Sequence, residues 1–186
     1  MDTGLNLVRY DDINENDFLE YILEWEALKE NIVPSSTRRR NFTYDEMMKK
    51  WKDDESSKAY DAGFVPSTLY FFIGDVRIIG ALHFRHELSG RLLLNGGNIG
   101  YGIRPSERRK GYATLMLKMF LETLDKERYD KVLITCDDNN NGSARTIEKN
   151  NGTLIDKPVC SQEGIGYIFD VIDEKYRVCY RDNGRR

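Results

Sequence analysis

The spacing of hydrophobic positions predicts a strand followed by a helix at the start of the chain. Leu5–Arg9 alternates apolar and polar residues, as a half-buried strand does. Apolar residues then recur at helical spacing as far as about Leu28, and Asn14 or Asn16 is suited to cap the start of that helix. We expect the apolar face of this helix to pack in the core. Its members are Phe18, Tyr21, Ile22, Trp25 and Leu28.

A second helix is predicted by the capping box Thr43-x-x-Glu46, in which each residue satisfies a backbone group of the other. The apolar side of this helix consists of Met47, Met48 and Trp51. The polar connection before it, 29–41, carries three consecutive arginines at 38–40. That run is either a solvated loop or an electrostatic guide for an anionic ligand, and both interpretations stay open.

The rest of the chain alternates between strand and helix patterns. Two β-rich runs meet at Gly74-Asp75, which is typical of a hairpin. The run Val132-Leu133-Ile134 is continuously apolar and indicates a strand covered on both faces. The expected elements are a loop at 53–66, strands at 67–72 and 76–88, a turn at 89–97, a strand at 98–104, helices at 109–126 and 143–150, and strands at 153–159 and 166–172. This order predicts a mixed α/β fold with a central, mostly antiparallel sheet flanked by helices and one parallel βαβ unit.

Composition indicates one globular domain over residues 1–186, with a polar tail at 173–186 that we expect to be frayed. The 28 basic and 31 acidic residues give a net charge of −3, so nucleic acid is not an expected partner. No apolar run is long enough for a membrane span, and the first residues do not resemble a signal peptide. The three cysteines are widely spaced and fit neither a disulfide framework nor a metal site. No metal is expected, and the cytoplasm is the default compartment.

The clearest candidate for binding chemistry is a basic turn that precedes the helix expected at 109–126. Residues 97–113 read GNIGYGIRPSERRKGYA, and Pro105 ends the strand because it cannot donate to a ladder. The N-terminus of a helix presents N–H groups without helical partners, and its dipole favours an anion. Gly111 lets the backbone approach a phosphate, and Arg108, Arg109 and Lys110 surround it. We therefore expect a phosphorylated ligand.

The spacing Arg108-x-x-Gly111-x-Ala113 resembles the Arg/Gln-x-x-Gly-x-Gly/Ala signature of the GNAT superfamily of acetyl-CoA-dependent N-acetyltransferases. A second segment, 136–152, reads CDDNNNGSARTIEKNNG and resembles the strand-end Asn, helix Ser and closing E-K-x-x-G pattern of that family. These motifs cover 98–154, and the order of the expected elements fits the family over nearly the whole chain. The resemblance implies the GNAT fold and acetyl-CoA as a co-substrate.

The resemblance also implies which residues contact acetyl-CoA. The N–H of Ile103 would bind the acetyl oxygen, and Gly102 suits a bulge where a side chain would crowd the ligand. Asn140 would contact the pantetheine arm, although it also suits a helix cap, and the two roles are compatible. The cofactor-binding residues implied by the resemblance are Ile103, Arg104, Pro105, Arg108, Arg109, Lys110, Gly111, Tyr112, Ala113, Thr114, Asn140 and Ser143.

Proton transfer is less well defined by the sequence. Many members of the family have a tyrosine where Ile147 stands, and Glu or His where Asn98 stands, so neither residue transfers by position. The catalytic groups that we expect are the backbone N–H of Ile103 and the side chains of His83 and Tyr101. Further ionisable candidates are His86, Glu87, Tyr112 and Tyr167.

The expected function is transfer of an acetyl group from acetyl-CoA to a primary amine by direct attack in a ternary complex, because no well-placed nucleophile is visible. The acceptor is a small-molecule amine or a peptide amine that the sequence does not identify. The alternative is a non-catalytic acyl-CoA-binding sensor or interaction module of the same fold, which the replacements at Asn98 and Ile147 favour. Exposed strand edges are compatible with a homodimer.

Overall fold

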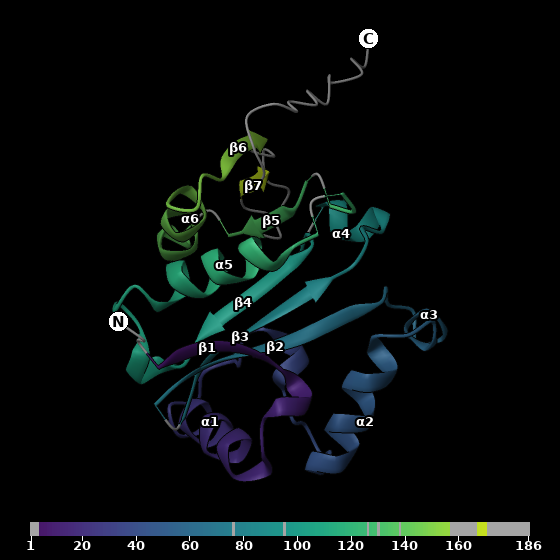
Figure 1. The fold of residues 1–186 in the computed structure, drawn as a ribbon, viewed down its shortest axis with the longest axis vertical. Coiled ribbons are helices and arrows are strands. Elements are labelled where there is room, and N and C mark those ends of the chain that lie inside the picture. The colour runs from purple at the N-terminus through teal and green to yellow at the C-terminus, as the bar shows by residue number, and fades with distance from the viewer. Residues whose placement is uncertain are drawn as a thin grey trace.

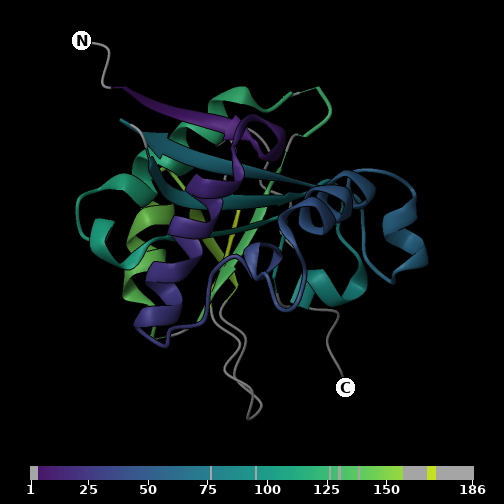
Figure 2. The same ribbon diagram turned by 90° about the horizontal axis from the view of Figure 1, so that it is seen from below.

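A four-stranded antiparallel sheet with the order β1-β2-β3-β4 lies at the centre of the protein. Helices α1 and α2 cover one face of this sheet and α5 covers the other (Figures 1 and 2). A second antiparallel sheet with the order β5-β7-β6 lies beyond β4. The mixed α/β architecture and the mostly antiparallel central sheet expected from the sequence are therefore confirmed.

The computed structural model describes residues 4–75, 77–94, 96–125, 127–129, 131–137, 139–156 and 167–170. Within these ranges, no helix has the length and apolar character needed to cross a membrane. The expected tail at 173–186 lies outside the described residues. The strands are β1 (Leu5–Arg9), β2 (Ser67–Gly74), β3 (Arg77–Arg85), β4 (Ile99–Ile103), β5 (Leu133–Cys136), β6 (Thr153–Asp156) and β7 (Tyr167–Asp170). The helices are α1 (Glu15–Ala27), α2 (Tyr44–Asp54), α3 (Lys58–Asp61), α4 (Gly90–Leu94), α5 (Tyr112–Thr123) and α6 (Asn141–Glu148), with 3₁₀ turns η1 (Tyr10–Asp12), η2 (Ser35–Thr37) and η3 (Pro105–Glu107).

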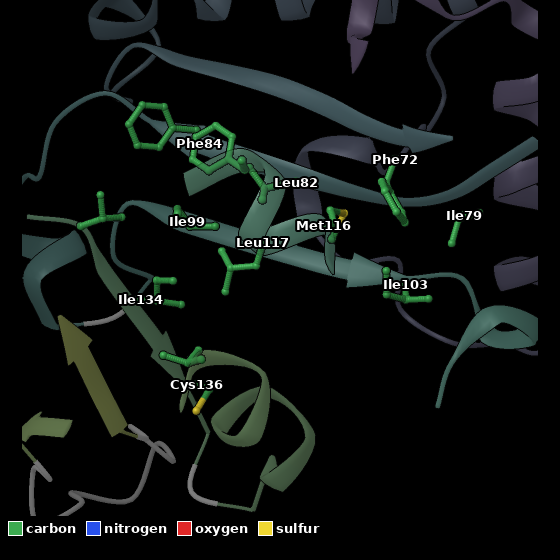
Figure 3. Close-up of a cluster of buried hydrophobic side chains, with 13 residues drawn as sticks. Phe72, Ile79, Leu82, Phe84, Ile99, Ile103, Met116, Leu117, Ile134 and Cys136 are labelled. Atoms are coloured by element: carbon green, nitrogen blue, oxygen red, sulfur yellow. The ribbon is translucent and has the colours of Figure 1, made fainter. Parts of the chain in front are cut away.

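Two hydrophobic clusters occupy the two faces of the central sheet, because successive strand residues point to opposite sides. On the α1 and α2 face, Phe71 packs edge-on against Phe18 and Trp51. On the α5 face, the cluster drawn in Figure 3 joins side chains of β2, β3, β4 and β5 to α5. Its labelled members are Phe72, Ile79, Leu82, Phe84, Ile99, Ile103, Met116, Leu117, Ile134 and Cys136.

The local signals in the sequence fix the starts of two helices. The Asn14 side chain accepts a hydrogen bond from the Asp17 amide at 3.0 Å and begins α1, and Thr43 and Glu46 form the expected capping box of α2. Phe18, Tyr21, Ile22 and Trp25 are buried as expected. Leu28 is 55 % exposed, because α1 ends at Ala27 and the chain turns away from the sheet.

Several expected boundaries are wrong. The helix expected at 109–126 begins only at Tyr112, because Arg109 and Gly111 have positive φ angles of 66° and 85°, and it ends at Thr123. The turn expected at 89–97 contains α4, and the loop expected at 53–66 contains α3. Such short helices carry too few periodic positions to be recognised from the sequence.

The expected parallel βαβ unit is present as β4–α5–β5, but its two strands do not pair along their length. Among the described residues, every ladder is antiparallel, and β4 and β5 belong to different sheets. The two strands meet where they begin, at Asn98 and Leu133, and Figure 3 shows them diverging toward Ile103 and Cys136. We call the region between 99–103 and 133–136 the fork.

Asn98 holds the closed end of the fork together. Its backbone N–H donates to the Leu133 carbonyl at 2.7 Å, and its side-chain oxygen accepts from the Leu133 N–H at 2.9 Å. On the other side, its carbonyl accepts from the Arg85 N–H at 2.7 Å and its Nδ2 donates to the Arg85 carbonyl at 3.1 Å. One residue that is 5 % exposed thus connects β3, β4 and β5 through both its backbone and its side chain.

Replacing Asn98 with Ala should therefore destabilise the protein by about 2–4 kcal/mol, because the Leu133 N–H and the Arg85 carbonyl would be buried without these partners. Urea unfolding measures this change. Asn6→Ala, at an exposed position of β1, is the matched control and should change the free energy of unfolding by less than about 0.5 kcal/mol. Equal effects of the two substitutions would contradict the role assigned to Asn98.

Candidate active site

The amide of Ile103 points into the fork. Hydrogen bonds from Arg85 N to Asn98 O and from Arg104 N to Ile79 O fix which residues of β4 bond to β3. Because bonding alternates along an antiparallel pair, Gly100 and Gly102 face β3, whereas the N–H and C=O of Ile103 face the fork. The Ile103 carbonyl indeed accepts a hydrogen bond at 3.2 Å from the Arg108 side chain rather than from β3. The Ile103 N–H is therefore placed to donate to a ligand in the fork.

The N-terminus of α5 follows at the open end of β4. The first helical bond runs from Leu115 N to Gly111 O, so the N–H groups of Tyr112, Ala113 and Thr114 lie before it without helical acceptors. No side chain caps this end. A Cβ at Gly111 would meet nothing within 4 Å, so the backbone of the turn is open to a ligand. A 12-residue helix with an uncapped, accessible N-terminus is suited to hold a phosphate.

The three cations of the turn have different surroundings. Arg108 forms a two-pronged pair with Glu30, at 2.6 and 3.1 Å, and its guanidinium lies 4.9 Å from the centre of the Trp25 ring. Lys110 pairs with Glu107 at 2.9 Å. Arg109 is exposed and has no ion pair within the described part of the chain. Of the three cations expected around a phosphate, Arg109 is thus the one whose charge is not already matched by a carboxylate.

Arg104 lies in the interior and connects the turn to α1. Its side chain is 1 % exposed and makes paired bonds to Glu20, at 2.6 and 2.7 Å, and a bond to Glu24 at 2.6 Å. Burial alone would lower the pKa of the Arg104 guanidinium, but the hydrogen bonds to Glu20 and Glu24 outweigh it, so the pKa is raised. Glu24 also accepts from the backbone N–H of Ser106 at 2.6 Å. The Arg104 side chain therefore holds the turn on α1 and is not directed at a ligand.

The face of β4 opposite α5 is covered by the connection between α1 and α2. A Cβ at Gly102 would lie 2.2 Å from the Val33 carbonyl oxygen, so only glycine allows this approach. Gly102 pairs regularly with Ala81, and the ladder between β3 and β4 has no register shift. The expected bulge at Gly102 is thus wrong, and the crowding that excludes a side chain comes from Val33.

Tyr101 spans the fork on the α5 and α6 side. Its hydroxyl lies 2.8 Å from Ser143 Oγ, on the first turn of α6, and burial raises the pKa of Tyr101 to about 12. Asn140 caps this helix by accepting from the Ser143 N–H at 3.0 Å. Ile147, one turn further on, is fully buried in the core. The structure thus brings together Tyr101, Ser143 and Asn140 beside the fork.

His83 lies on the opposite face of the sheet, on β3 and across from Gly100. Burial, with a smaller contribution from the positive charges of Arg85 and Lys50, lowers the pKa of His83 to about 3. At neutral pH the ring is therefore uncharged and a very weak base. This environment corrects the expectation that His83 is a general base, because a base works best when its pKa lies near the operating pH.

The remaining residues implied by the resemblance lie between the fork and the start of α5. Pro105 begins η3 directly after β4, and Tyr112 packs its ring against Phe72, with centroids 6.1 Å apart. Asn150 Nδ2 donates to the Thr114 carbonyl at 3.1 Å and joins the end of α6 to the start of α5. The backbone groups at the start of α5 and the side chains around Ser143 therefore belong to one continuous region.

Sequence reasoning does not predict the roles of four residues that shape this site. The sequence shows only that Asn98 cannot act as a base, it marks Glu30 as a candidate carboxylate for a cationic acceptor rather than as the partner of Arg108, and Glu20 and Glu24 resemble ordinary surface acids. Glu20 and Glu24 are four residues apart and therefore share one side of α1, away from its aromatic face. That spacing is the one signal that could have suggested a partner for them.

A sequence profile described as "Acetyltransferase (GNAT) domain" matches residues 5–153. No curated protein sequence matches the chain. Among solved structures, the ribosomal L7/L12 alpha-N-protein acetyltransferase RimL in complex with coenzyme A is 17 % identical, with a TM-score of 0.58 over 92 % of this chain and 96 % of that one.

Two further structures have the same fold. The microcin C7 self-immunity acetyltransferase MccE, in complex with acetyl-CoA and AMP, is 15 % identical, with a TM-score of 0.59 over 93 % of this chain and 98 % of that one. The N-acetyltransferase PseH of Campylobacter jejuni, in complex with acetyl coenzyme A, is 12 % identical, with a TM-score of 0.54 over 90 % and 98 % of the two chains. At these identities the likeness concerns the fold.

The profile match over most of the chain shows that this protein belongs to the GNAT acetyltransferase family. The resemblance stated from the two sequence motifs and the GNAT fold are confirmed. The protein is accordingly an acyltransferase by family.

Proposed function

We propose that the protein is an N-acetyltransferase that moves an acetyl group from acetyl-CoA to a primary amine by direct attack in a ternary complex. The observation that carries this proposal is the amide of Ile103, which points into the fork beside the uncapped N-terminus of α5. The N-terminus of α5 offers donors for phosphate oxygens, and the Ile103 amide offers a donor for a carbonyl oxygen. A molecule with a pyrophosphate at one end and a thioester at the other fits both.

The chain supplies three groups to the proposed reaction. The backbone N–H groups of Tyr112, Ala113 and Thr114, with the charge of Arg109, hold the pyrophosphate. Asn140 and Ser143 lie along the pantetheine arm. The N–H of Ile103 donates to the acetyl oxygen as negative charge develops on it during attack, and a preformed donor of this kind is often a large contribution to catalysis.

Two proton transfers complete the reaction. The amine nitrogen forms a bond to the carbonyl carbon and loses a proton to water, and the carbon–sulfur bond breaks with the electron pair leaving on sulfur. Tyr101 is the proton donor that we assign to the leaving thiolate, because its hydroxyl lies between β4 and α6 and its raised pKa keeps it protonated. A proton from water then restores the Tyr101 hydroxyl, so the proton lost by the amine is balanced by the one gained on sulfur. Ile147 cannot take this role, since its side chain is apolar and buried.

Binding of acetyl-CoA, measured by calorimetry, tests the phosphate site. Gly111→Glu should weaken binding at least roughly 10-fold, because the new carboxylate lies where the phosphate oxygens would approach. Gly63→Glu is the matched control, because Gly63 also has a positive φ and open space around it. Gly63 follows α3 and does not belong to the turn before α5. Unchanged affinity in Gly111→Glu, or an equal loss in both variants, would contradict the assignment.

Tyr101→Phe should lower kcat by roughly 100-fold, since a general acid contributes about that much or more, while the affinity for acetyl-CoA stays within about 2-fold. Release of free thiol over a panel of amines measures the rate. Because Tyr101 stays protonated up to about its pKa of 12, the wild-type rate should not fall between pH 8 and 10 through loss of this proton. A full rate in Tyr101→Phe would remove it from the mechanism, and tight binding without turnover of any amine would favour the acyl-CoA sensor.

The cytoplasmic location and the homodimer expected from the sequence stay predictions. The acceptor is a small-molecule or peptide amine in this proposal.

A further inference from the structure

Arg85 lies at the end of β3, on the face of the sheet opposite α5. Its Nη1 donates to the carbonyls of Gly96 and Gly97, each at 3.0 Å. A Cβ at Gly100 would lie 3.7 Å from Arg85 Nη2 and 3.8 Å from the Pro34 ring. The guanidinium therefore covers the first half of β4, beside the connection between α1 and α2.

The charge of Arg85 has no carboxylate partner within the described part of the chain. Among the described residues, the guanidinium donates only to two backbone carbonyls, both from Nη1, which leaves Nε and both hydrogens of Nη2 available. Burial lowers the pKa of Arg85, and no negative charge offsets it. A half-buried cation without a counter-ion costs free energy, and a bound anion would recover that cost.

Two positive charges act on His83, which shares this face. Burial lowers the pKa of His83 most, and the charges of Arg85 and Lys50 lower it as well, although Lys50 itself pairs with Asp54. The three arginines at 38–40 follow the segment that contacts Gly100, and none of them forms an ion pair with another described residue. This favours the second interpretation of that run, an electrostatic guide for an anion.

The position of Arg85 separates it from the proposed acetyl-CoA site. The phosphate-binding turn follows the C-terminal end of β4, whereas Arg85 lies near its N-terminal end and on the other face. Ile103 is three positions after Gly100, a span of about 10 Å along a strand. An anion at Arg85 would thus lie near the opposite end of β4 from the acetyl carbonyl, about 10 Å away along the strand.

We propose that Arg85 binds an anionic group of the acceptor, a carboxylate or a phosphate, about 10 Å from the amine that is acetylated. This inference rests on the proposed function and specifies its substrate class. The acceptor is then an amine with a negative charge at a defined distance rather than a plain polyamine or alkylamine.

Matched pairs of amines test this inference. The probes are ω-amino acids with four to ten carbons, the alkylamines of equal length, and the ω-aminoalkyl phosphates. In the wild-type protein, kcat/KM should be roughly 10- to 100-fold higher for an anionic amine of the right length than for the alkylamine, as for a hydrogen-bonded charge pair. Comparing carboxylates with phosphates then distinguishes the two anions.

Arg85→Gln should abolish this preference while leaving kcat/KM for alkylamines and the affinity for acetyl-CoA within about 2-fold. Arg85→Lys should retain part of the preference, because it keeps the charge but loses the planar fork of donors. Arg91→Gln, at an exposed position of α4, is the control and should leave the preference for anionic amines unchanged.

Calorimetry on the CoA-loaded protein, with the N-acetylated forms of the same probes, compares the affinities of charged and uncharged products without turnover. Because this comparison can be made with the wild-type protein alone, it tests the inference even if Arg85→Gln does not fold. Equal binding of charged and uncharged acetylated probes by the wild-type protein, or a preference that survives Arg85→Gln, overturns the inference. Absence of acetyl-CoA binding in the wild type would instead overturn the proposed function itself.

Discussion

The hydrogen bonds of Asn98 determine which backbone groups of β4 remain free to bind a ligand. A strand inside a sheet has its backbone groups paired on both sides, and none is left for a ligand. Asn98 supplies backbone and side-chain bonds to Leu133 on one side and to Arg85 on the other, so β5 is attached to β4 at this point. Beyond it the strands separate, and the amides of alternate β4 residues face the fork.

The separation is supported from both faces of the sheet. On one face the Val33 backbone lies against Gly102, and on the other Tyr101 reaches Ser143 of α6. At the open end, Arg104 fixes the turn to α1 through carboxylates that are 80 and 84 residues earlier in the chain. The position of the Ile103 amide is thus set by contacts from three layers, although this amide has no partner in β3. Rigid donors are effective because they need no reorganisation when charge develops.

The surroundings of the basic turn change how anion binding there should be understood. The sequence suggests a site made by three adjacent cations. In the structure, Glu30 and Glu107 already match the charges of Arg108 and Lys110. We therefore propose that recognition of a phosphate depends on the backbone amides of α5 and on Arg109, while Arg108 donates to the carbonyl of Ile103. An unmatched cation lies elsewhere, at Arg85, where the acceptor is proposed to bind.

Local patterns in the sequence were enough to predict the strands of the hairpin, the caps of α1 and α2 and the strand–turn–helix order at the phosphate site. Each depends on residues within a few positions of one another. The roles of Asn98, Arg104 and Arg108 depend instead on partners 35 to 84 residues away, which no local pattern encodes. The start of α5 expected from the sequence is too early because three good helix formers precede Gly111, and positive φ at Arg109 overrides their propensity.

The most direct test of this account is the backbone amide NMR signal of Ile103 as acetyl-CoA is added. We predict that the signals of Ile103 and of Tyr112, Ala113 and Thr114 shift together and saturate at one ligand per chain. CoA without the acetyl group should shift the three helix amides fully but Ile103 far less. If the signal of Ile103 does not respond to acetyl-CoA while the protein binds it, the fork is not the acyl site and the account is wrong.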